Sequence, residues 1–287
     1  MSKRTLITVR DCINFAEGQF KTVYFGHGTD NARDEACYLV LSILRLPCDV
    51  DLDTELTAAA QQVVIRAIQR RIQERIPTAY LTQEAWFAGM PFYVDKRVII
   101  PRSPLAELIQ NSFAPWIKPE QVKRILDIGT GSGCIAISCA YAFPHAHIDA
   151  VDNSEVALEV ARINCAKHDV QQRVRLLKSD LFSAVQGETY DIVVSNPPYV
   201  SCAEMQTLPQ EYLHEPQCAL LAGEQGNEII TRIIATAAKH LTAHGILVVE
   251  VGNSSVVLQK HPTLPFIWLD FTAGEGEVFL LLAQHLK

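Results

Sequence analysis

The sequence lacks the features that mark several large classes of protein. No apolar run approaches the roughly 18 residues that a membrane-spanning helix needs, and none follows the first five residues, so we expect neither a membrane protein nor a secretory signal peptide. Charged residues make up only 20% of the chain and hydrophobic residues 48%, which excludes an intrinsically disordered protein. The 287 residues suffice for one large domain or two smaller ones.

The cysteines and histidines also lack the spacing of a redox or metal-binding motif. None of the eight cysteines forms a Cys-x-x-Cys pair, so we expect reduced thiols and a cytoplasmic protein. His240 and His244 have the spacing of two zinc ligands on one helix face. No third ligand or nearby glutamate accompanies them, so no metal site is expected.

A surplus of basic residues is missing as well, because the formal net charge is −7. Proteins that bind nucleic acids usually present a basic face, so no stable DNA binding is expected. An acidic enzyme can nevertheless attract a strongly cationic protein substrate through long-range electrostatics. The chain also contains no Gly-x-Ser-x-Gly elbow that would indicate a hydrolase.

The N-terminal part of the chain has the pattern of helices. An apolar run at residues 39–44 is followed by a long periodic stretch at 55–76, which ends at Pro77. Apolar side chains lie roughly on one face of that stretch, at Val63, Ile65, Ile68 and Ile72. Arginines lie largely on another face, which we interpret as solvated, at Arg66, Arg70 and Arg71. The pattern predicts a helical domain over residues 1–85.

A short β-rich segment follows at residues 86–103. Residues 86–94 and 98–100 predict two short strands around Asp95-Lys96-Arg97, that is, a hairpin that links two domains. A helix is then expected from Ser103 or Pro104 to about Phe113.

From Val122 onward, apolar strands alternate with helical stretches, which predicts an α/β fold with a doubly wound parallel sheet. A helix is expected at Glu228–His244, with Gly245 as its C-terminal cap. The chain is expected to end in a hairpin that turns at Ala273–Gly276. Strands are expected at residues 125–128, 147–152, 174–180, 190–195 and 246–251.

Asn196-Pro197-Pro198-Tyr199 follows one of these strands and is the most informative motif. Neither proline has a backbone N–H, so carbonyl acceptors at this turn lack nearby backbone donors. The Asn196 side chain adds a further carbonyl, and Tyr199 adds an aromatic face that can hold a planar group or a cation. Such acceptors suit a ligand –NH2 group, although two prolines after a strand can also form a plain turn.

A second motif, Asp127-Ile128-Gly129-Thr130-Gly131-Ser132-Gly133, lies between an apolar strand and a buried helix. Glycines permit a tight turn and a close backbone approach to a ligand, and the helix start offers free N–H groups. The spacing matches neither the dinucleotide fingerprint nor the P-loop. Asp127 would repel a phosphate, but it could attract the charged amino group of an amino acid.

Acidic residues end two further strands. Asp152 and Asp180 follow apolar runs, and the carboxyl ends of parallel strands form the ligand-binding edge of an open α/β sheet. An acid at the end of the second strand can accept both hydroxyls of a ribose. Either acid taken alone would more often be a helix N-cap or a solvated strand end.

Together, these motifs resemble those of the S-adenosylmethionine-dependent N5-glutamine methyltransferases. The resemblance extends from about Ile76 to the C-terminus. It implies a seven-stranded, mostly parallel methyltransferase sheet with an antiparallel last strand over residues 104–287, and a substrate-recognition role for residues 1–85. Further matching stretches are Ile100-Pro101-Arg102, Glu215-Pro216 followed by Ala219-Leu220, and Gly223-Glu224-Gln225-Gly226.

The resemblance also implies where S-adenosylmethionine binds. Its amino acid end would lie near Asp127 and the loop Gly129–Gly133, which includes Thr130 and Gly131. Its ribose hydroxyls would bind Asp152, and its adenine would lie beside Asp180 and Leu181. Asn196 would also approach the cofactor.

The substrate amide would bind at the Asn-Pro-Pro-Tyr motif. An amide nitrogen is a poor nucleophile, so the carbonyls of the Asn196 side chain and the Pro197 backbone would orient it and favour its developing positive charge. Pro198 completes the bend, and Tyr199 would pack against the amide or the sulfonium. By resemblance, Ile99 would form part of the pocket wall.

Within this family, the chain is similar to the branch that methylates a glutamine of large-subunit ribosomal protein three. The matching stretches are Arg75–Leu81, Phe92–Asp95 and Ile99–Pro104. The release-factor branch typically carries Pro-Arg-Pro-Glu-Thr-Glu, where residues 101–106 here are Pro-Arg-Ser-Pro-Leu-Ala. We therefore predict a ribosomal substrate, with release factors as the alternative.

Two further alternatives belong to other functional classes. An N6-adenine nucleic-acid methyltransferase acts on a similar planar –NH2 group, but the chain has no evident target-reading domain and no basic surplus. A non-catalytic assembly factor that binds the cofactor is disfavoured by the intact Asn-Pro-Pro-Tyr motif.

Overall fold

The computed structural model describes residues 7–272 and 276–286, which form two compact units. The first unit extends to Ala85 and also includes Pro209–His214. The second contains Trp86–Leu208 and the chain from Glu215 onward. No helix in the described ranges is long and apolar enough to cross a membrane.

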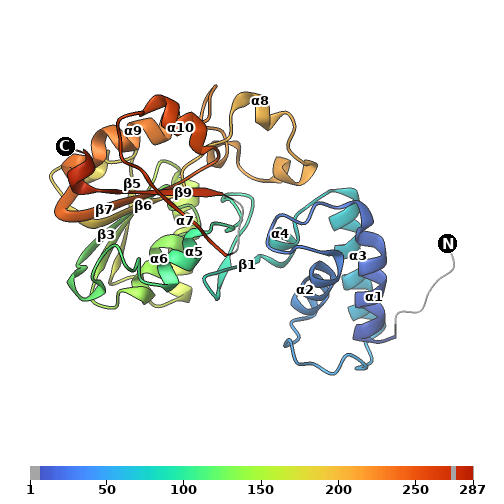
Figure 1. Cartoon of the computed structure of the whole chain (residues 1–287). Coiled ribbons are helices and arrows are strands. Elements are labelled where there is room, and N and C mark those ends of the chain that lie inside the picture. Colours follow the sequence, from blue (N-terminus) through green and yellow to red (C-terminus); the bar gives the residue numbers. More distant parts are fainter. Residues whose placement is uncertain (1–6, 273–275, 287) are drawn as a thin grey trace. The chain divides into compact units, whose positions relative to one another are not determined.

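The first unit is a small helical domain (Figure 1). Its helices are α1 (Val9–Gln19), α2 (Ala32–Leu44), α3 (Ala58–Gln73) and α4 (Thr78–Thr82). The first three begin where a side-chain oxygen accepts a hydrogen bond from a free backbone N–H group, at Thr8, Asn31 and Thr57. Their apolar faces meet in one buried core that includes Ile13, Leu39 and Ile68.

The apolar face of α3 is rotated relative to the sequence prediction. Val63 is 49% exposed, whereas Val64, Ala67 and Ile68 are buried. Arg71, predicted on a solvated face, is only 1% exposed, so that prediction was wrong for this residue. Helical periodicity alone could not identify Arg71 as buried, because its partners come from other parts of the chain.

Those partners are two buried carboxylates. The Arg71 guanidinium donates to Glu35 at 2.6 Å and to Glu211 at 3.1 Å. Glu211 belongs to Pro209–His214, which follows the Asn-Pro-Pro-Tyr motif in the chain but packs in the first unit. Burial opposes ionisation of Glu211, but the backbone N–H of Tyr24 and the charge of Arg71 outweigh it, so the pKa of Glu211 is lowered.

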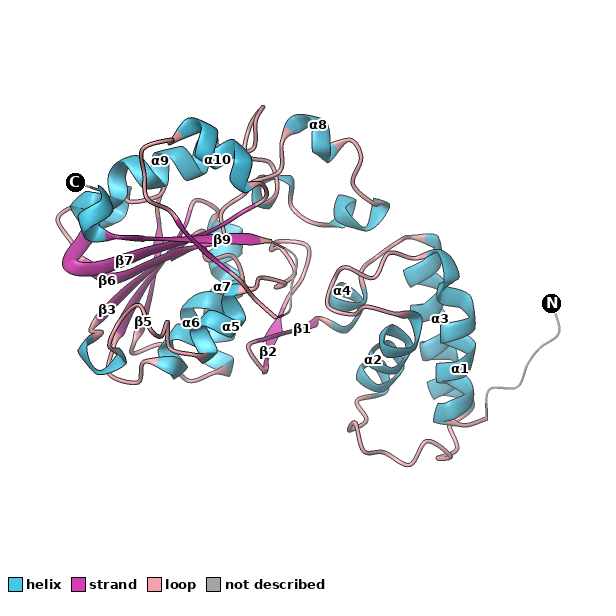
Figure 2. Cartoon of the chain, viewed as in Figure 1, coloured by secondary structure: helices cyan, strands magenta, loops and turns pink. Residues whose placement is uncertain are grey.

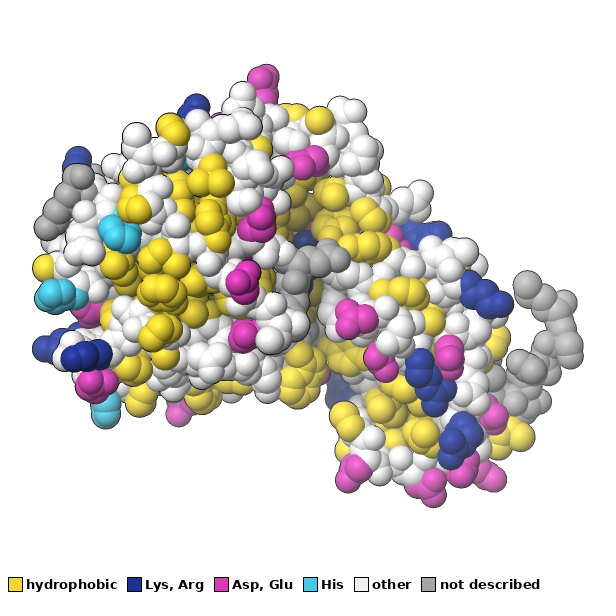
Figure 3. Space-filling model, in the orientation of Figure 1, with side chains coloured by type: hydrophobic (Ala, Val, Ile, Leu, Met, Phe, Trp, Pro, Cys, Tyr) yellow, Lys and Arg dark blue, Asp and Glu magenta, His cyan; other side chains and the backbone are white. Residues whose placement is uncertain are grey.

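The surface of the first unit carries both signs of charge. Figure 3 shows Lys and Arg side chains interspersed with Asp and Glu side chains over its helices. Arg10 pairs with Asp53 at 2.8 Å, and Arg33 pairs with Glu17 at 3.0 Å. Such exposed pairs contribute little to stability, and the side shown has no continuous basic face.

A hairpin lies where the chain passes from the first unit to the second, but its turn is not where the sequence predicted it. The strands are β1 (Glu84–Phe87) and β2 (Met90–Tyr93), and they turn at Ala88-Gly89. Both turn residues have positive φ angles, 50° and 78°, as the tight turn of a two-residue hairpin loop requires. Residues 98–100, predicted as a strand, are irregular.

The second unit contains the predicted α/β sheet, with seven strands in the order β5-β4-β3-β6-β7-β9-β8. The first five are parallel, and β9 runs antiparallel to both β7 and β8. The predicted fold class is confirmed. The strands are β3 (Arg124–Ile128), β4 (His147–Asp152), β5 (Val174–Lys178), β6 (Tyr190–Ser195), β7 (Leu241–Val251), β8 (Ile267–Leu269) and β9 (Glu277–Leu282).

Helices cover both faces of this sheet (Figure 2). They are α5 (Leu105–Gln110), α6 (Cys134–Ala142), α7 (Glu155–Lys167), α9 (Glu228–Ala237) and α10 (Ser254–Lys260). The short helix α8 (Cys202–Met205) has no buried residue and does not cover the sheet. Ile125 points into a core shared with α5, α6 and α7, whereas its neighbour Leu126 points into a core shared with α9 and α10. Burial on both faces explains why these strands are continuous apolar runs. Short 3-10 turns occur at Phe20–Thr22, Pro119–Gln121, Ser183–Val185, Gln210–His214, Gln217–Ala219, Ala238–His240 and Ala283–Leu286.

The helix α9 is shorter than its sequence pattern predicted. It ends at Ala237, and the chain is already in β7 at Leu241, so Gly245 is a strand residue and not a helix cap. The pairing of β6 with β7 is irregular between Tyr190 and Ile192. A side chain at Gly245 would place its Cβ 2.9 Å from the Tyr190 carbonyl oxygen, so close backbone approach requires glycine there. The predicted final turn, Ala273–Gly276, lies outside the described residues except for Gly276.

Replacing Arg71 by methionine is expected to destabilise the first unit by about 3–5 kcal/mol, because buried Glu35 then loses its cation and buried Glu211 keeps only Arg75, at 3.5 Å. The matched control is Arg70→Met, since Arg70 is half exposed and pairs with Glu74 at 3.4 Å. That control should cost about 0.5 kcal/mol or less. Urea denaturation followed by far-ultraviolet circular dichroism measures both effects, and equal losses would contradict the role given to Arg71.

Candidate functional site

A pocket of about 360 Å³ in the second unit lies at the carboxyl ends of β3, β4 and β6. The strand β3 pairs with β4 on one side and β6 on the other, so this is the point where the strand order reverses. Open α/β sheets bind ligands at such a point. The pocket is lined by Arg97, Val98, Ile99, Ile128, Gly129, Gly131, Asp152, Asn153, Ser154, Ala157, Ser179, Asp180, Leu181, Asn196, Pro197, Pro198, Pro216, Cys218, Ala219, Ile229 and Arg232.

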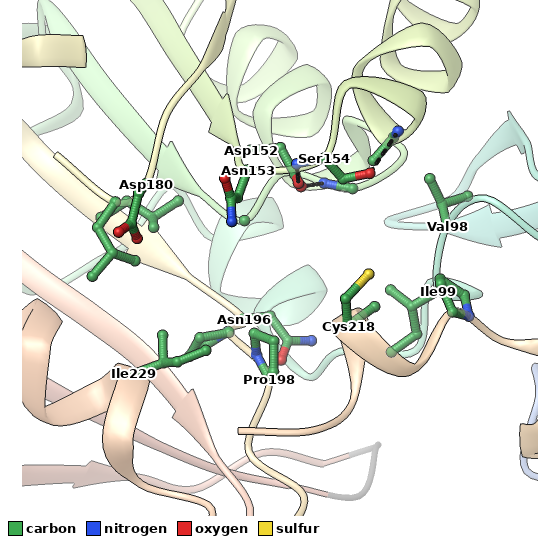
Figure 4. Close-up of a pocket in the computed structure, with 18 of the residues that line it drawn as sticks. Val98, Ile99, Asp152, Asn153, Ser154, Asp180, Asn196, Pro198, Cys218 and Ile229 are labelled. Carbon is green, nitrogen blue, oxygen red and sulfur yellow. Dashed lines mark hydrogen bonds between the residues drawn. The ribbon is translucent and has the colours of Figure 1, made fainter. Parts of the chain in front are cut away.

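Asp152, the last residue of β4, lies on one wall of the pocket (Figure 4). Its two carboxylate oxygens accept backbone N–H groups of Gly131 at 2.9 Å and Ser154 at 2.8 Å. Burial raises the pKa of Asp152, and these N–H groups partly offset that effect. Each carboxylate oxygen has a further lone pair, so Asp152 can still accept two ligand hydroxyls.

The glycine loop after β3 has the backbone conformation that its sequence predicted. Gly129 and Gly131 both line the pocket and have positive φ angles of 73° and 53°. Gly133 faces away from the pocket lining, because a Cβ there would lie 3.3 Å from the Ala161 Cβ on α7. Its predicted contact with a ligand is therefore replaced by close packing of the loop against a helix.

Asp127 and the loop residue Thr130 are buried and do not line the pocket. Asp127 is fully buried, and its Oδ2 accepts the Thr130 hydroxyl at 2.6 Å and the Ala136 N–H at 3.2 Å. Among the described residues, nothing hydrogen-bonds to its Oδ1. Burial raises the pKa of Asp127 to about 7, against the opposing effect of these two donors. Through Oδ2, the Asp127 carboxyl ties the loop to α6, and the attraction of a ligand amino group by Asp127 stays a prediction.

The bend after β6 brings Asn196, Pro197 and Pro198 into the pocket. It is anchored to β3 by the Ser195 hydroxyl, which donates to the Ile128 carbonyl at 2.7 Å. Within the described ranges, no protein group hydrogen-bonds to the Asn196 carboxamide, and no backbone N–H donates to the Pro197 carbonyl. Both carbonyls therefore remain available as acceptors beside the glycine loop.

Tyr199 is not among the lining residues, contrary to its predicted place in the substrate pocket. Its hydroxyl donates to Glu250 Oε1 at 3.0 Å. A Cβ at Gly252 would lie 2.9 Å from the Tyr199 ring atom Cδ2, so this ring packs closely on the end of β7. Tyr199 therefore holds the end of the bend and does not form a wall of the pocket.

Asp180 and Leu181, which the family resemblance placed beside the adenine, line one end of the pocket. The Asp180 carboxylate pairs with Arg232 of α9 at 2.7 Å, and both side chains are more than half exposed. An exposed pair is weak, so the carboxylate can exchange this partner for a ligand donor. Leu181 has a φ of 51°, which turns the chain at the pocket edge.

Several lining residues were not predicted. Asn153 and Ser154 directly follow Asp152 in the chain. Cys218 follows Pro216, which belongs to a stretch that matches the methyltransferase motifs. Proximity in the sequence could have indicated all three residues. Ile229 and Arg232 come from the first turns of α9, and no sequence signal separated them from an ordinary helix surface. In Figure 4, Ile99 and Cys218 lie on one side of Asn196, and Ile229 and Asp180 on the other.

The site therefore combines two kinds of recognition in one cavity. A carboxylate beside a glycine loop suits a ligand with neighbouring hydroxyls, and apolar walls at Leu181 and Ile229 suit a flat ring. The unpaired carbonyls of Asn196 and Pro197 suit an –NH2 donor. No group of three His, Cys, Asp or Glu side chains within the described ranges could hold a metal ion.

Comparison with known proteins finds a match to one family model and several curated relatives of high sequence identity. Residues 110–225 match the model of the methyltransferase small domain. The ribosomal protein uL3 glutamine methyltransferase of Neisseria meningitidis serogroup A is 48% identical over 288 residues, which cover 98% of this chain and 95% of the relative. The protein of the same name from Neisseria gonorrhoeae is also 48% identical, covering 98% of this chain and 96% of that one.

Among solved structures, the hMettl16 catalytic domain in complex with a MAT2A 3′UTR hairpin matches 77% of this chain and 80% of its own. The TM-score is 0.50 and the sequence identity 15%, so this likeness concerns the fold alone.

Asp127→Asn should change how stability depends on pH. Because the pKa of Asp127 is about 7 in the folded protein and about 3.9 in an unfolded chain, the native state holds an extra proton between those values. The native protein should therefore lose stability as pH rises from about 4 to about 7, by a few kcal/mol in order of magnitude. The stability of the variant relative to the native protein should rise over this interval. A constant difference between pH 5 and pH 8 in urea denaturation would contradict this account.

Proposed function

Because the chain belongs to the family of ribosomal protein uL3 glutamine methyltransferases, we propose that it transfers a methyl group from S-adenosylmethionine to the side-chain amide nitrogen, N5, of a glutamine in uL3. The observation that carries this proposal is the bend Asn196-Pro197-Pro198. It lines a pocket at the strand ends, and its Asn196 side-chain carbonyl and Pro197 backbone carbonyl have no hydrogen-bond donor among the described residues. A glutamine side chain ends in the –NH2 donor that such acceptors recognise.

The residues present fit S-adenosylmethionine. Asp152 has spare acceptor capacity for the two ribose hydroxyls, and Gly131 leaves room for close backbone approach beside it. Asp180 and Leu181 provide an acceptor and an apolar wall for an adenine ring at the far end of the pocket. When bound, the cofactor supplies an electrophilic methyl group on a positively charged sulfur.

The protein's contribution to the reaction is to orient the amide nitrogen and stabilise its charge. The Asn196 side-chain carbonyl and the Pro197 backbone carbonyl would each accept one hydrogen of the –NH2 group, which fixes the direction of the nitrogen lone pair. As positive charge develops on the nitrogen, both hydrogen bonds strengthen. No general base is needed before transfer, and the extra proton can leave to solvent afterwards.

We assign substrate recognition to the helical unit, residues 1–85, and methyl transfer to residues 104–287, with residues 86–103 as the linker. Support comes from the separate core of each unit and from the location of the whole pocket in the second. Because Pro209–His214 belongs to the first unit, recognition also involves a segment that follows the Asn-Pro-Pro-Tyr motif.

We propose the cytoplasm as the site of action. The substrate class, an unassembled ribosomal protein, and eight free cysteines both support this location. The net charge of −7 would help to attract a cationic ribosomal protein.

The direct test incubates the protein with methyl-labelled S-adenosylmethionine and a cell extract, followed by mapping of labelled peptides by mass spectrometry. Label on a glutamine of uL3, absent with the Asn196→Ala variant, is expected. Label confined to a release factor or a nucleic acid would contradict the proposed substrate.

Asn196→Ala should lower kcat by about 100-fold or more, as expected for loss of one hydrogen-bonding group that acts in the transition state. Cofactor affinity should change much less, because the described contacts of Asp152 and the glycine loop remain. Steady-state kinetics on purified uL3, combined with calorimetry of cofactor binding, separates the two effects. An unchanged kcat would remove Asn196 from the reaction.

Asp152→Ala should weaken S-adenosylmethionine binding by roughly 10-fold or more, since hydrogen bonds to a charged group contribute about 1.5–3 kcal/mol. The control is Glu120→Ala, which removes an exposed carboxylate outside the pocket lining. Calorimetry measures both affinities. Native affinity in the Asp152 variant would exclude this residue from the cofactor site.

A further inference from the structure

Glu250 is a buried carboxylate in the middle of an apolar strand. It is the tenth residue of β7, where Ile246, Leu247, Val248, Val249 and Val251 are all buried. Its own side chain is 1% exposed. An isolated charge is costly to bury, so a strand of this kind would be expected to carry an apolar residue at that position.

Two hydroxyl groups surround this carboxylate. The Tyr199 hydroxyl donates to Glu250 Oε1 at 3.0 Å, and the Ser103 hydroxyl donates to Glu250 Oε2. The Ser103 oxygen in turn accepts the Leu105 N–H at 3.2 Å, which fixes the direction of its own proton. Burial raises the pKa of Glu250 to about 7, against the opposing effects of Ser103, Tyr199 and the charge of Arg102.

Two glycines allow the backbone to pack closely against Tyr199. A Cβ at Gly226 would lie 2.4 Å from the Tyr199 carbonyl oxygen, and a Cβ at Gly252 would lie 2.9 Å from its ring. Gly226 also has a φ of 76°, which strains any residue with a side chain. The ring and backbone of Tyr199 therefore have little freedom once its hydroxyl is bound to Glu250.

Tyr199 ends the bend that carries the two pocket carbonyls. Pro197 and Pro198 have fixed φ angles, so a displacement of Tyr199 is transmitted to Asn196 with few compensating rotations. At the other end, the Ser195 hydroxyl binds Ile128. The bend is thus held at both ends. At the second end, Glu250 binds the Tyr199 side chain, while the Val200 backbone pairs with the backbones of Leu220 and Ala222.

We propose that Glu250 is a positioning residue for methyl transfer: by accepting the hydroxyls of Tyr199 and Ser103 together, it aims the Asn196 and Pro197 carbonyls at the substrate –NH2 group. This inference rests on the proposed function. Glu250 lies outside the pocket lining and acts through Tyr199. Ser103 precedes α5, Tyr199 follows β6 and Glu250 lies in β7. Residues from three distant parts of the chain therefore set the geometry of the bend.

The first test compares Glu250→Gln, Glu250→Ala and Tyr199→Phe in steady-state kinetics on uL3. We expect Glu250→Ala to lower kcat about 10- to 100-fold, because a small misplacement of reacting groups has an effect of this size. KM for uL3 and the cofactor dissociation constant should stay within about 3-fold. Glu250→Gln, which keeps one carbonyl acceptor, should recover part of the loss. The matched control, Glu188→Gln, changes a carboxylate outside the pocket lining and should retain native kcat.

A double-mutant cycle then decides whether Glu250 acts through Tyr199. The combination of Glu250→Ala and Tyr199→Phe should be no slower than Glu250→Ala alone, because Glu250→Ala already removes the hydrogen bond that Tyr199→Phe removes. Multiplicative losses in kcat would overturn the proposal, as would a native kcat in Glu250→Ala or a loss confined to KM or cofactor affinity.

Hydrogen exchange separates this proposal from the assignment of the substrate. Peptides covering residues 195–203 should take up deuterium faster in Glu250→Ala and Tyr199→Phe than in the native protein, whichever substrate is methylated. Unchanged uptake in both variants would overturn the positioning role even if uL3 is methylated. Failure of the native protein to methylate uL3, with faster uptake in both variants, would contradict the proposed function and leave Glu250 as the group that holds the bend.

Discussion

The proposed function depends on two carbonyl groups, one in the Asn196 side chain and one in the Pro197 backbone, to which no group among the described residues donates a hydrogen bond. Pro197 and Pro198 remove the N–H groups that a turn would otherwise offer, and the Asn196 carboxamide has no hydrogen-bonding partner among the described residues. Unpaired acceptors in a partly buried pocket are costly, and a ligand –NH2 group removes that cost. In the proposed function, recognition and catalysis would use the same two atoms, since these would orient the nitrogen and stabilise the charge that develops on it.

The rest of the second unit keeps those atoms in place. The central strand β3 supplies both the glycine loop beside the cofactor site and the Ile128 carbonyl that anchors Ser195. Asp127 binds the Thr130 hydroxyl and the Ala136 N–H, and Glu250 binds the Tyr199 hydroxyl. Both carboxyls are buried and lie outside the pocket lining. Each therefore acts on the pocket by holding a backbone segment that lines it or ends beside it.

Sequence alone predicted the fold class and nine of the 21 residues that line the pocket, because strand ends, glycine spacing and the Asn-Pro-Pro-Tyr motif are local signals. It failed where tertiary contacts decide. Arg71 lies within a helix whose pattern suggested a solvated face, yet its partner Glu211 is 140 residues away. The α9 pattern continued to His244, but pairing with β6 draws Leu241 into a strand. The buried roles of Asp127 and Tyr199 depend on which way each side chain turns, and residue order does not specify that.

A solved complex with a uL3 peptide and the demethylated form of the cofactor would test the central claim most directly. The account predicts that the nitrogen of the target glutamine lies within about 2.7–3.2 Å of both the Asn196 Oδ1 and the Pro197 carbonyl oxygen. The same nitrogen should face the sulfur across the pocket. A glutamine nitrogen held by other groups, with these two carbonyls turned towards the protein interior, would contradict the account.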